Sequence, residues 1–248
     1  MKKLLVAFLV AALLATSAVA VVSAKPGKTV RPEKLDQVIF VHPVAPDKPG
    51  KPPAPPGKPP TEEEEKVLDY YELWGGYLAK TANYRINPNV NLVTPGGPIE
   101  AVNSAAEAWD AVTADDLFKY AGTTEKRWYA EDGQNTVSWV KFTPRNYIAV
   151  AVMWYDPETL IIWEFDIVFN TFQKWGIDPV KEDGVTIGAF DIQNIATHEF
   201  GHPVGLDDLY DEIYSELTMY GYSSKGETKK CTLEEGDISG AQFLYEAP

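Results

Sequence analysis

The chain has 248 residues, 45% hydrophobic and 23% charged, so it is long enough to bury a core without disulfides. Its formal charge of −14 excludes nucleic acid as an expected partner, because nucleic acid is bound by basic patches. The single cysteine, Cys231, excludes an intrachain disulfide and a zinc site built from several cysteines.

Residues 1–24 have the pattern of a secretory signal peptide. Lys2 and Lys3 precede an apolar stretch over residues 4–22, and small residues at 18–20 offer a cleavage site. An uncleaved anchor is the alternative, since about 17–25 apolar residues can span a bilayer. The sequence therefore predicts a secreted protein, tethered to the cell surface and in contact with membrane only if this segment is retained.

Residues 25–60 are predicted to be a proline-rich linker. Nine of the 18 residues from 43 to 60 are proline, which excludes a regular helix or a strand in a sheet. Thr61 precedes four glutamates, which is typical of the start of a helix. We therefore place the folded domain at residues 61–248, and leave His42 outside it, just ahead of the proline run that starts at Pro43.

The domain is predicted to be α+β. Apolar residues at helical spacing predict a long amphipathic helix over residues 98–120. Segments rich in β-branched and aromatic residues, separated by turn signals, predict strands over residues 136–142, 147–155 and 160–170. A second helix is expected over 189–202, and Thr232 with Glu235 forms a capping box that opens a third.

The second helix carries a pattern typical of a catalytic zinc site. His198 and His202 are four residues apart, so both imidazoles project from one helix face at a separation that suits one zinc ion. Glu199 is placed to take a proton from a zinc-activated water. Gly205 permits a sharp turn that can return Asp208 to the metal as the third ligand.

Asp207 is the rival third ligand, although the spacing favours Asp208. Two histidines and one carboxylate leave a fourth coordination position open, as in catalytic zinc sites, whereas structural zinc sites are closed. Paired core histidines, or a solvated face bearing histidine and glutamate, would produce the same spacing without a metal.

The order His-Glu-x-x-His-x-x-Gly-x-x-Asp, followed by Met219, resembles the metzincin zinc peptidases with their Met-turn. It is similar in particular to matrixin-like secreted peptidases of archaea and bacteria that have aspartate as third ligand. Segments 165–170 and 233–241 support the resemblance, which covers roughly residue 77 to the C-terminus. It implies a twisted, mostly parallel sheet with an antiparallel edge strand, an active-site helix, a Met-turn with Met219 as an apolar floor under the metal, and a C-terminal helix.

The resemblance also implies the activity. We expect a secreted, monomeric zinc metalloendopeptidase that hydrolyses protein or peptide substrates, with Glu199 as general base. Tyr220 or Tyr222 can donate a hydrogen bond to the oxyanion, although a packed aromatic is the ordinary role of each. Substrate is expected to lie extended along an edge strand over 160–170. The residues assigned to that strand are Glu164, Asp166, Val168 and Asn170.

Two features depart from the family pattern at the site itself. Metzincins more often use a third histidine, and the negative charge of Asp208 should make the bound water less acidic. Pro203 lacks an N–H and clashes with the carbonyl of Glu199, so the helix should end or kink there.

The sequence also departs from vertebrate matrixins in the segment that keeps those enzymes latent. No upstream cysteine is present to cap the zinc, and the segment before residue 60 is too short for a folded prodomain. Ca²⁺ at the acidic loop 178–183 is an alternative to a solvated loop. The alternative function is a degenerate, non-hydrolytic zinc- and peptide-binding surface protein, against which the presence of Glu199 argues.

Overall fold

The computed structural model describes residues 30–46, 70–179 and 187–248. The expected signal segment, most of the proline-rich linker, the helix start at Thr61 and most of the loop 178–183 lie outside these ranges. The folded unit discussed below extends from Pro32 to Pro248. Within the described ranges, no helix combines the length and apolar character needed to cross a membrane.

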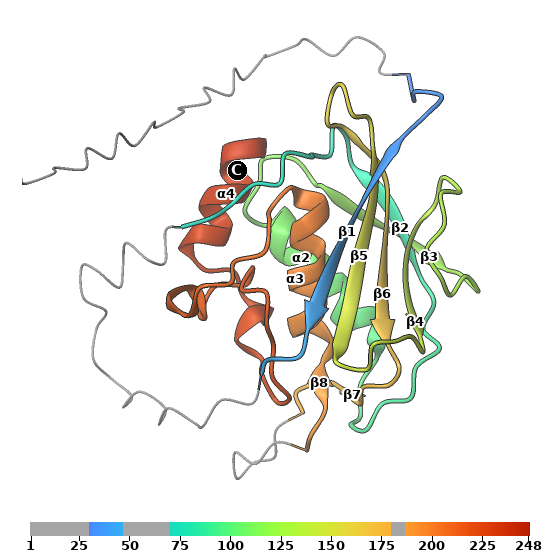
Figure 1. Cartoon of the computed structure of the whole chain (residues 1–248), viewed down its shortest axis with the longest axis vertical. Coiled ribbons are helices and arrows are strands. Elements are labelled where there is room, and N and C mark those ends of the chain that lie inside the picture. Colours follow the sequence, from blue (N-terminus) through green and yellow to red (C-terminus); the bar gives the residue numbers. More distant parts are fainter. Residues whose placement is uncertain (1–29, 47–69, 180–186) are drawn as a thin grey trace, which may run out of the picture. The chain divides into compact units, whose positions relative to one another are not determined.

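Six strands form the main sheet in the order β1-β5-β6-β4-β2-β3 (Figure 1). Their bounds are β1 Asp36–Pro43, β2 Ala82–Ile86, β3 Phe118–Thr123, β4 Asn135–Val140, β5 Tyr147–Tyr155 and β6 Ile162–Asn170. β5 runs antiparallel to both of its neighbours, whereas the β6–β4, β4–β2 and β2–β3 pairings are parallel. The predicted α+β fold with a mostly parallel sheet is confirmed.

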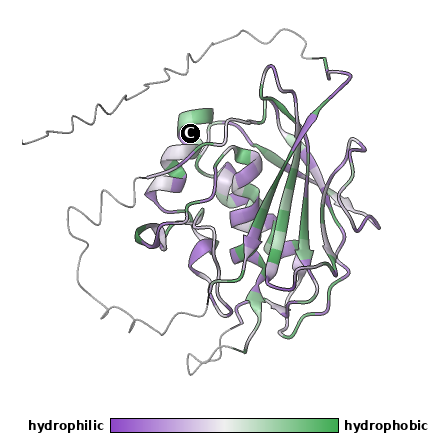
Figure 2. Cartoon of the chain, viewed as in Figure 1, coloured by the Kyte–Doolittle hydropathy of each residue, from purple (hydrophilic) through white to green (hydrophobic). Residues whose placement is uncertain are grey.

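Within the described residues, three helices accompany the sheet: α2 Pro98–Asp110, α3 Ile192–Val204 and α4 Glu235–Tyr245. The short strands β7 Trp175–Gly176 and β8 Phe190–Asp191 pair just before α3, and the 3-10 turns η1 Glu212–Tyr214 and η2 Lys229–Cys231 lie between α3 and α4. α2 and α3 share the main hydrophobic core with the sheet, which includes Trp109, Phe165 and Phe200. Hydrophobic residues accordingly run along β5 and β6 in Figure 2.

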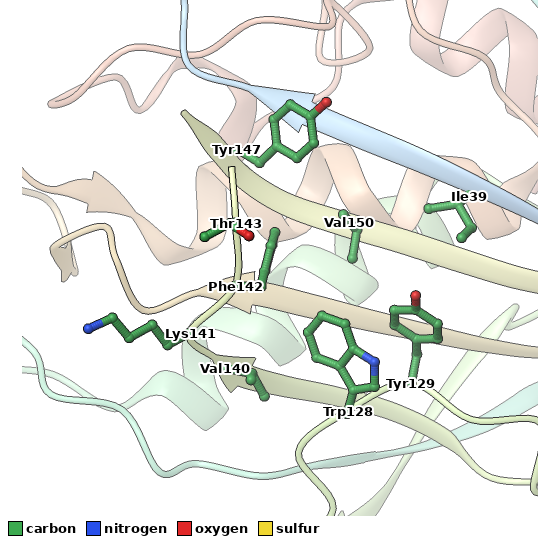
Figure 3. Close-up of a pocket in the computed structure, with 9 residues that line it drawn as sticks. All are labelled: Ile39, Trp128, Tyr129, Val140, Lys141, Phe142, Thr143, Tyr147 and Val150. Atoms are coloured by element: carbon green, nitrogen blue, oxygen red, sulfur yellow. The ribbon is translucent and has the colours of Figure 1, made fainter. Parts of the chain in front are cut away.

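The opposite face of the sheet has a smaller apolar cluster that includes Val150, Trp154 and Val168. An open hollow beside it is lined by Ile39 of β1, Trp128, Tyr129 and residues of β4 and β5 (Figure 3). Lys141 is the only ionisable side chain of its lining apart from two tyrosines, so the hollow has no candidate ligands for zinc.

Residues 36–43, which form β1, were predicted to belong to the linker 25–60, and that prediction is wrong. Residues Asp36–Pro43 form a strand along the full length of β5. The run of β-branched and aromatic residues from Val38 to Val41 is a normal strand signal, but the prolines that follow it obscured its end. The domain therefore includes this segment, and its start lies near Pro32 instead of residue 61.

The ends of two helices also differ from the prediction. α2 ends at Asp110, whose carboxylate accepts hydrogen bonds from the N–H groups of Leu117 and Phe118 and so starts β3 instead of extending the helix. The capping box of α4 is formed by Glu234 and Asp237, and not by Thr232 and Glu235. In both cases an acidic side chain captures free backbone N–H groups.

β6 is not an edge strand, so the expectation that it pairs with substrate is wrong. It lies between β5 and β4 and is hydrogen-bonded to both. The chain reverses after β5, which leaves β5 on the outer side of the hairpin. The side chains proposed for substrate binding lie on the face away from the helices: Glu164, Asp166, Val168 and Asn170. The Glu164 carboxylate instead accepts N–H bonds from Asp132 and Gly133, which fixes a surface turn.

Candidate active site

The helix α3 holds the histidine pair in a completely buried setting. Asp191 caps its start by accepting a hydrogen bond from the N–H of Asn194 at 2.8 Å. The helix ends at Val204, one residue beyond Pro203, as the missing proline N–H favours. Gly205 then takes a φ of 122°, which turns the chain toward Asp208.

Both histidines are oriented by backbone carbonyls. Nδ1 of His198 lies 2.8 Å from the carbonyl oxygen of Thr218, and Nδ1 of His202 lies 3.0 Å from that of Leu206. Because a carbonyl oxygen can only accept, each Nδ1 carries the proton and each Nε2 carries a lone pair. Burial keeps the rings neutral: it lowers the pKa of His202 to about 4 and also lowers the pKa of His198.

Asp208 completes a group of three donors. Its Oδ1 lies 3.1 Å from Nε2 of His198 and 3.9 Å from Nε2 of His202, and one ligand atom from each residue lies within 4.8 Å of the others. The Tyr210 hydroxyl donates to its other oxygen at 2.9 Å. Nε2 of His198 and Oδ1 of Asp208 are buried without a hydrogen-bond partner, so two electron-rich atoms face each other. A cation between them removes this repulsion, and the N₂O donor set fits zinc.

Asp207 is directed elsewhere. Its carboxylate accepts a hydrogen bond from the N–H of Asp208 at 2.8 Å, and its own N–H donates to the carbonyl of Glu72. Among the described residues, the groups that could jointly hold a metal ion include Asp208 but not Asp207. The geometry therefore favours Asp208 as the third donor.

Glu199 lies on α3 next to His198 and is fully buried. Burial and the nearby charge of Asp208 raise the pKa of Glu199 well above its ordinary value. A carboxylate with a raised pKa takes up a proton more readily, which a general base requires. Its Oε1 lies 3.0 Å from Nδ1 of His42, and its Oε2 is buried without a hydrogen-bond partner.

Met219 packs beneath the active-site helix. A Cβ atom added at Gly201 would lie 2.2 Å from the Met219 sulfur, so the two residues are in close contact. The Asp237 carboxylate at the start of α4 accepts hydrogen bonds from the N–H groups of Thr218 and Met219, at 2.9 and 3.1 Å. Helix α4 thereby fixes the turn, and the turn places the Thr218 carbonyl against His198.

The two tyrosines proposed for the oxyanion, Tyr220 and Tyr222, are linked to Lys230 through their backbone carbonyls. The buried ammonium group of Lys230 donates to the carbonyls of Tyr220 and Tyr222. The ring of Tyr222 packs edge-on against Tyr210, whose hydroxyl contacts Asp208. Tyr210 is thus the tyrosine that the structure joins to the candidate ligands, and the oxyanion role of Tyr220 or Tyr222 stays a prediction.

His42 is the site residue that the sequence analysis missed. It lies on β1 and is buried, with its ring 4.0 Å from that of His198 and its Nε2 3.1 Å from the Ser223 hydroxyl. The alternation of Val38, Phe40 and His42 along a strand was the signal that could have placed it on the side facing α3.

We expect Gly205→Ala to destabilise the domain by about 2–4 kcal/mol, because it adds backbone strain to a steric clash. A Cβ atom at Gly205 would lie 2.5 Å from the Gly76 carbonyl oxygen and 2.6 Å from Leu244. Gly133→Ala is the matched control, since Gly133 also has a positive φ of 79° but nothing lies within 4 Å. Urea unfolding of the two variants measures the loss of stability in each and so separates the clash from the backbone strain. Equal losses of stability would show that the contact of the added Cβ with Gly76 and Leu244 is unimportant.

Comparison with known proteins gives one positive result. Residues 77–246 match the family model described as matrixin, which covers more than half of the chain. A search of curated proteins found no match. The matched range contains the histidine pair, Asp208 and Met219, and it excludes β1 and His42.

Proposed function

The chain belongs to the matrixin family of zinc metalloendopeptidases, and from that premise we propose that its zinc is held by His198, His202 and Asp208, with Glu199 as general base. The observation that carries this proposal is the convergence of two Nε2 lone pairs and one carboxylate oxygen within 4.8 Å, beside a buried carboxylate. The substrates of a peptidase are proteins or peptides. We also propose that the protein is secreted, on the basis of the pattern in residues 1–24.

Each proposed residue has a distinct task. A zinc ion bound there supplies Lewis-acid chemistry, because it polarises the scissile carbonyl and acidifies the attacking water. Glu199 accepts the proton of that water and returns it to the leaving amine. The Thr218 and Leu206 carbonyls hold the imidazoles in the tautomer that presents Nε2 to the metal.

The proposal is tested by incubating the zinc-loaded full chain with a complex peptide mixture and identifying new peptide ends by mass spectrometry. We expect cleavages that disappear when a chelator removes the zinc and return when zinc is restored. If zinc binds but no new peptide ends appear, even with the His42→Ala variant described below, the degenerate, non-hydrolytic alternative is favoured.

A further inference from the structure

An extended segment lies between the edge of β5 and the loop after Met219, beside the candidate active site. β1 pairs antiparallel with β5, from Asp36 opposite Tyr155 to His42 opposite Ala149 (Figure 1). Just beyond β1, Val44 forms a parallel bridge with Ser223 on the other side. The segment is therefore hydrogen-bonded to the sheet edge and to the loop after Met219, as a peptide added to a sheet would be.

The side chains of β1 that face α3 fill the site. The ring of Phe40 stacks on that of His202, with centroids 4.1 Å apart and an interplanar angle of 12°. Two residues further on, His42 contacts both His198 and Glu199. Consequently His198, Glu199 and His202 are at most 1% exposed. A substrate carbonyl cannot reach Glu199 while β1 occupies this position.

The hydrogen bonds of His42 direct one ring nitrogen at the metal site. The Ser223 hydroxyl donates to Glu227 at 3.3 Å, so its oxygen can accept from Nε2 of His42. Nδ1 then carries the lone pair, 3.0 Å from Oε1 of Glu199, so a proton or a cation has to lie between these two atoms. Ligand atoms of His42, His198 and Glu199 lie within 4.8 Å of one another, so this group shares His198, and no other residue, with the group His198, His202 and Asp208. A neutral imidazole nitrogen beside a three-donor zinc site is suited to the position that a catalytic site leaves open.

We propose that residues 36–45 are an internal occupant of the substrate groove, and that His42 is a removable fourth ligand of the zinc ion. This inference rests on the zinc site proposed above. The structure then describes a closed form, in which substrate must displace β1 from β5 and water must replace His42 before hydrolysis. Displacement of β1 would leave β5 with a free edge for substrate, whereas β6 stays paired with β5 and β4.

The wild-type protein provides the first test. Hydrogen–deuterium exchange of residues 36–45 is measured in the zinc-loaded full chain with and without a peptide hydroxamate, which carries a zinc-chelating group on an extended peptide. We expect saturating hydroxamate to expel β1 and to accelerate exchange in this segment. Hydroxamate that binds without changing the exchange of residues 36–45 would overturn the proposal.

The second test compares His42→Ala with Ile39→Ala in the full chain. Ile39 lies on the outer side of the same strand and is 44% exposed, so its replacement leaves the site intact. Losing the His42 contacts should raise the affinity for hydroxamate by about 10- to 100-fold, the range expected for a hydrogen bond to a charged group. Ile39→Ala should behave as wild type, and equal affinities for all three proteins would overturn the proposal.

The cobalt-substituted proteins report the ligand directly. We expect the visible absorption spectrum of Co²⁺ bound to His42→Ala to differ from that of wild type, because one nitrogen ligand is replaced by water. Identical spectra would show that His42 is not a ligand. A spectral change and expulsion of β1 without any peptide cleavage would support the closed site and contradict the hydrolytic function, so the two proposals fail separately.

Discussion

Replacing Glu199 with glutamine is expected to lower the rate of peptide hydrolysis by about 10²- to 10⁴-fold, the usual contribution of a general base. Glutamine has nearly the same shape, but its amide cannot accept the proton of the attacking water. The Glu199 side chain is not among the three proposed ligands, so zinc affinity should remain that of wild type. Initial rates on a fluorogenic peptide identified from the cleavage data measure the effect, and a competition titration measures zinc.

Glu164→Gln is the matched control for this experiment. Glu164 is also a buried glutamate, but its carboxylate binds two N–H groups of a surface turn on the far side of the sheet. Its replacement should reduce stability without reducing the catalytic rate of the folded protein. β1 covers the site in wild type and in Glu199→Gln alike. The ratio of their hydrolysis rates is therefore measured again with His42→Ala present in both proteins. A similar loss for both glutamates would contradict the role of Glu199.

The local part of the candidate site could be predicted from the sequence. The four-residue spacing of His198 and His202 puts both rings on one face of any α-helix, whatever the rest of the fold. Gly205 signalled the turn that brings Asp208 back, since few other residues adopt its φ of 122°. These relations extend over about three helical turns, a range over which spacing determines geometry.

The parts that depend on strand pairing could not be predicted. β5 and β6 both read as strands, but the residue pattern of a strand does not say whether one or both of its edges are paired. The resemblance led to the prediction that β6 is an edge strand, whereas β6 lies between β5 and β4. His42 is separated from Glu199 by 157 residues, so only the pairing of β1 with β5 brings them together.

The groups that orient the ligands could not be predicted from the sequence either. The carbonyl oxygens of Thr218 and Leu206 act through the backbone, and their positions depend on turns and not on residue type. The turn before Met219 is fixed by Asp237, which the sequence placed only in the last helix. Orientation of a metal ligand thus comes from elements that meet at the site only after the domain has folded.

Asp208→Asn should weaken zinc binding by about 100-fold. Loss of a residue that only hydrogen-bonds to a metal ligand costs about 10- to 100-fold in affinity, and Asp208 is proposed to contact the metal directly, so we expect the upper end of this range. The amide keeps the volume of the side chain but loses the charge that balances zinc. Asp207→Asn is the matched control, since it makes the same exchange one residue away, at a carboxylate that binds the Asp208 N–H. A competition titration with a chromophoric chelator measures both affinities.

The same change should be visible in the stability of the protein. At a zinc concentration 100 times the wild-type Kd, binding stabilises the folded state by about 2.7 kcal/mol, whereas a 100-fold weaker Kd leaves about 0.4 kcal/mol. Unfolding of Asp208→Asn should therefore depend little on zinc under conditions in which wild type and Asp207→Asn are clearly stabilised. If Asp207→Asn loses the zinc effect and Asp208→Asn keeps it, the third ligand is Asp207, and the turn at Gly205 must differ when zinc is bound.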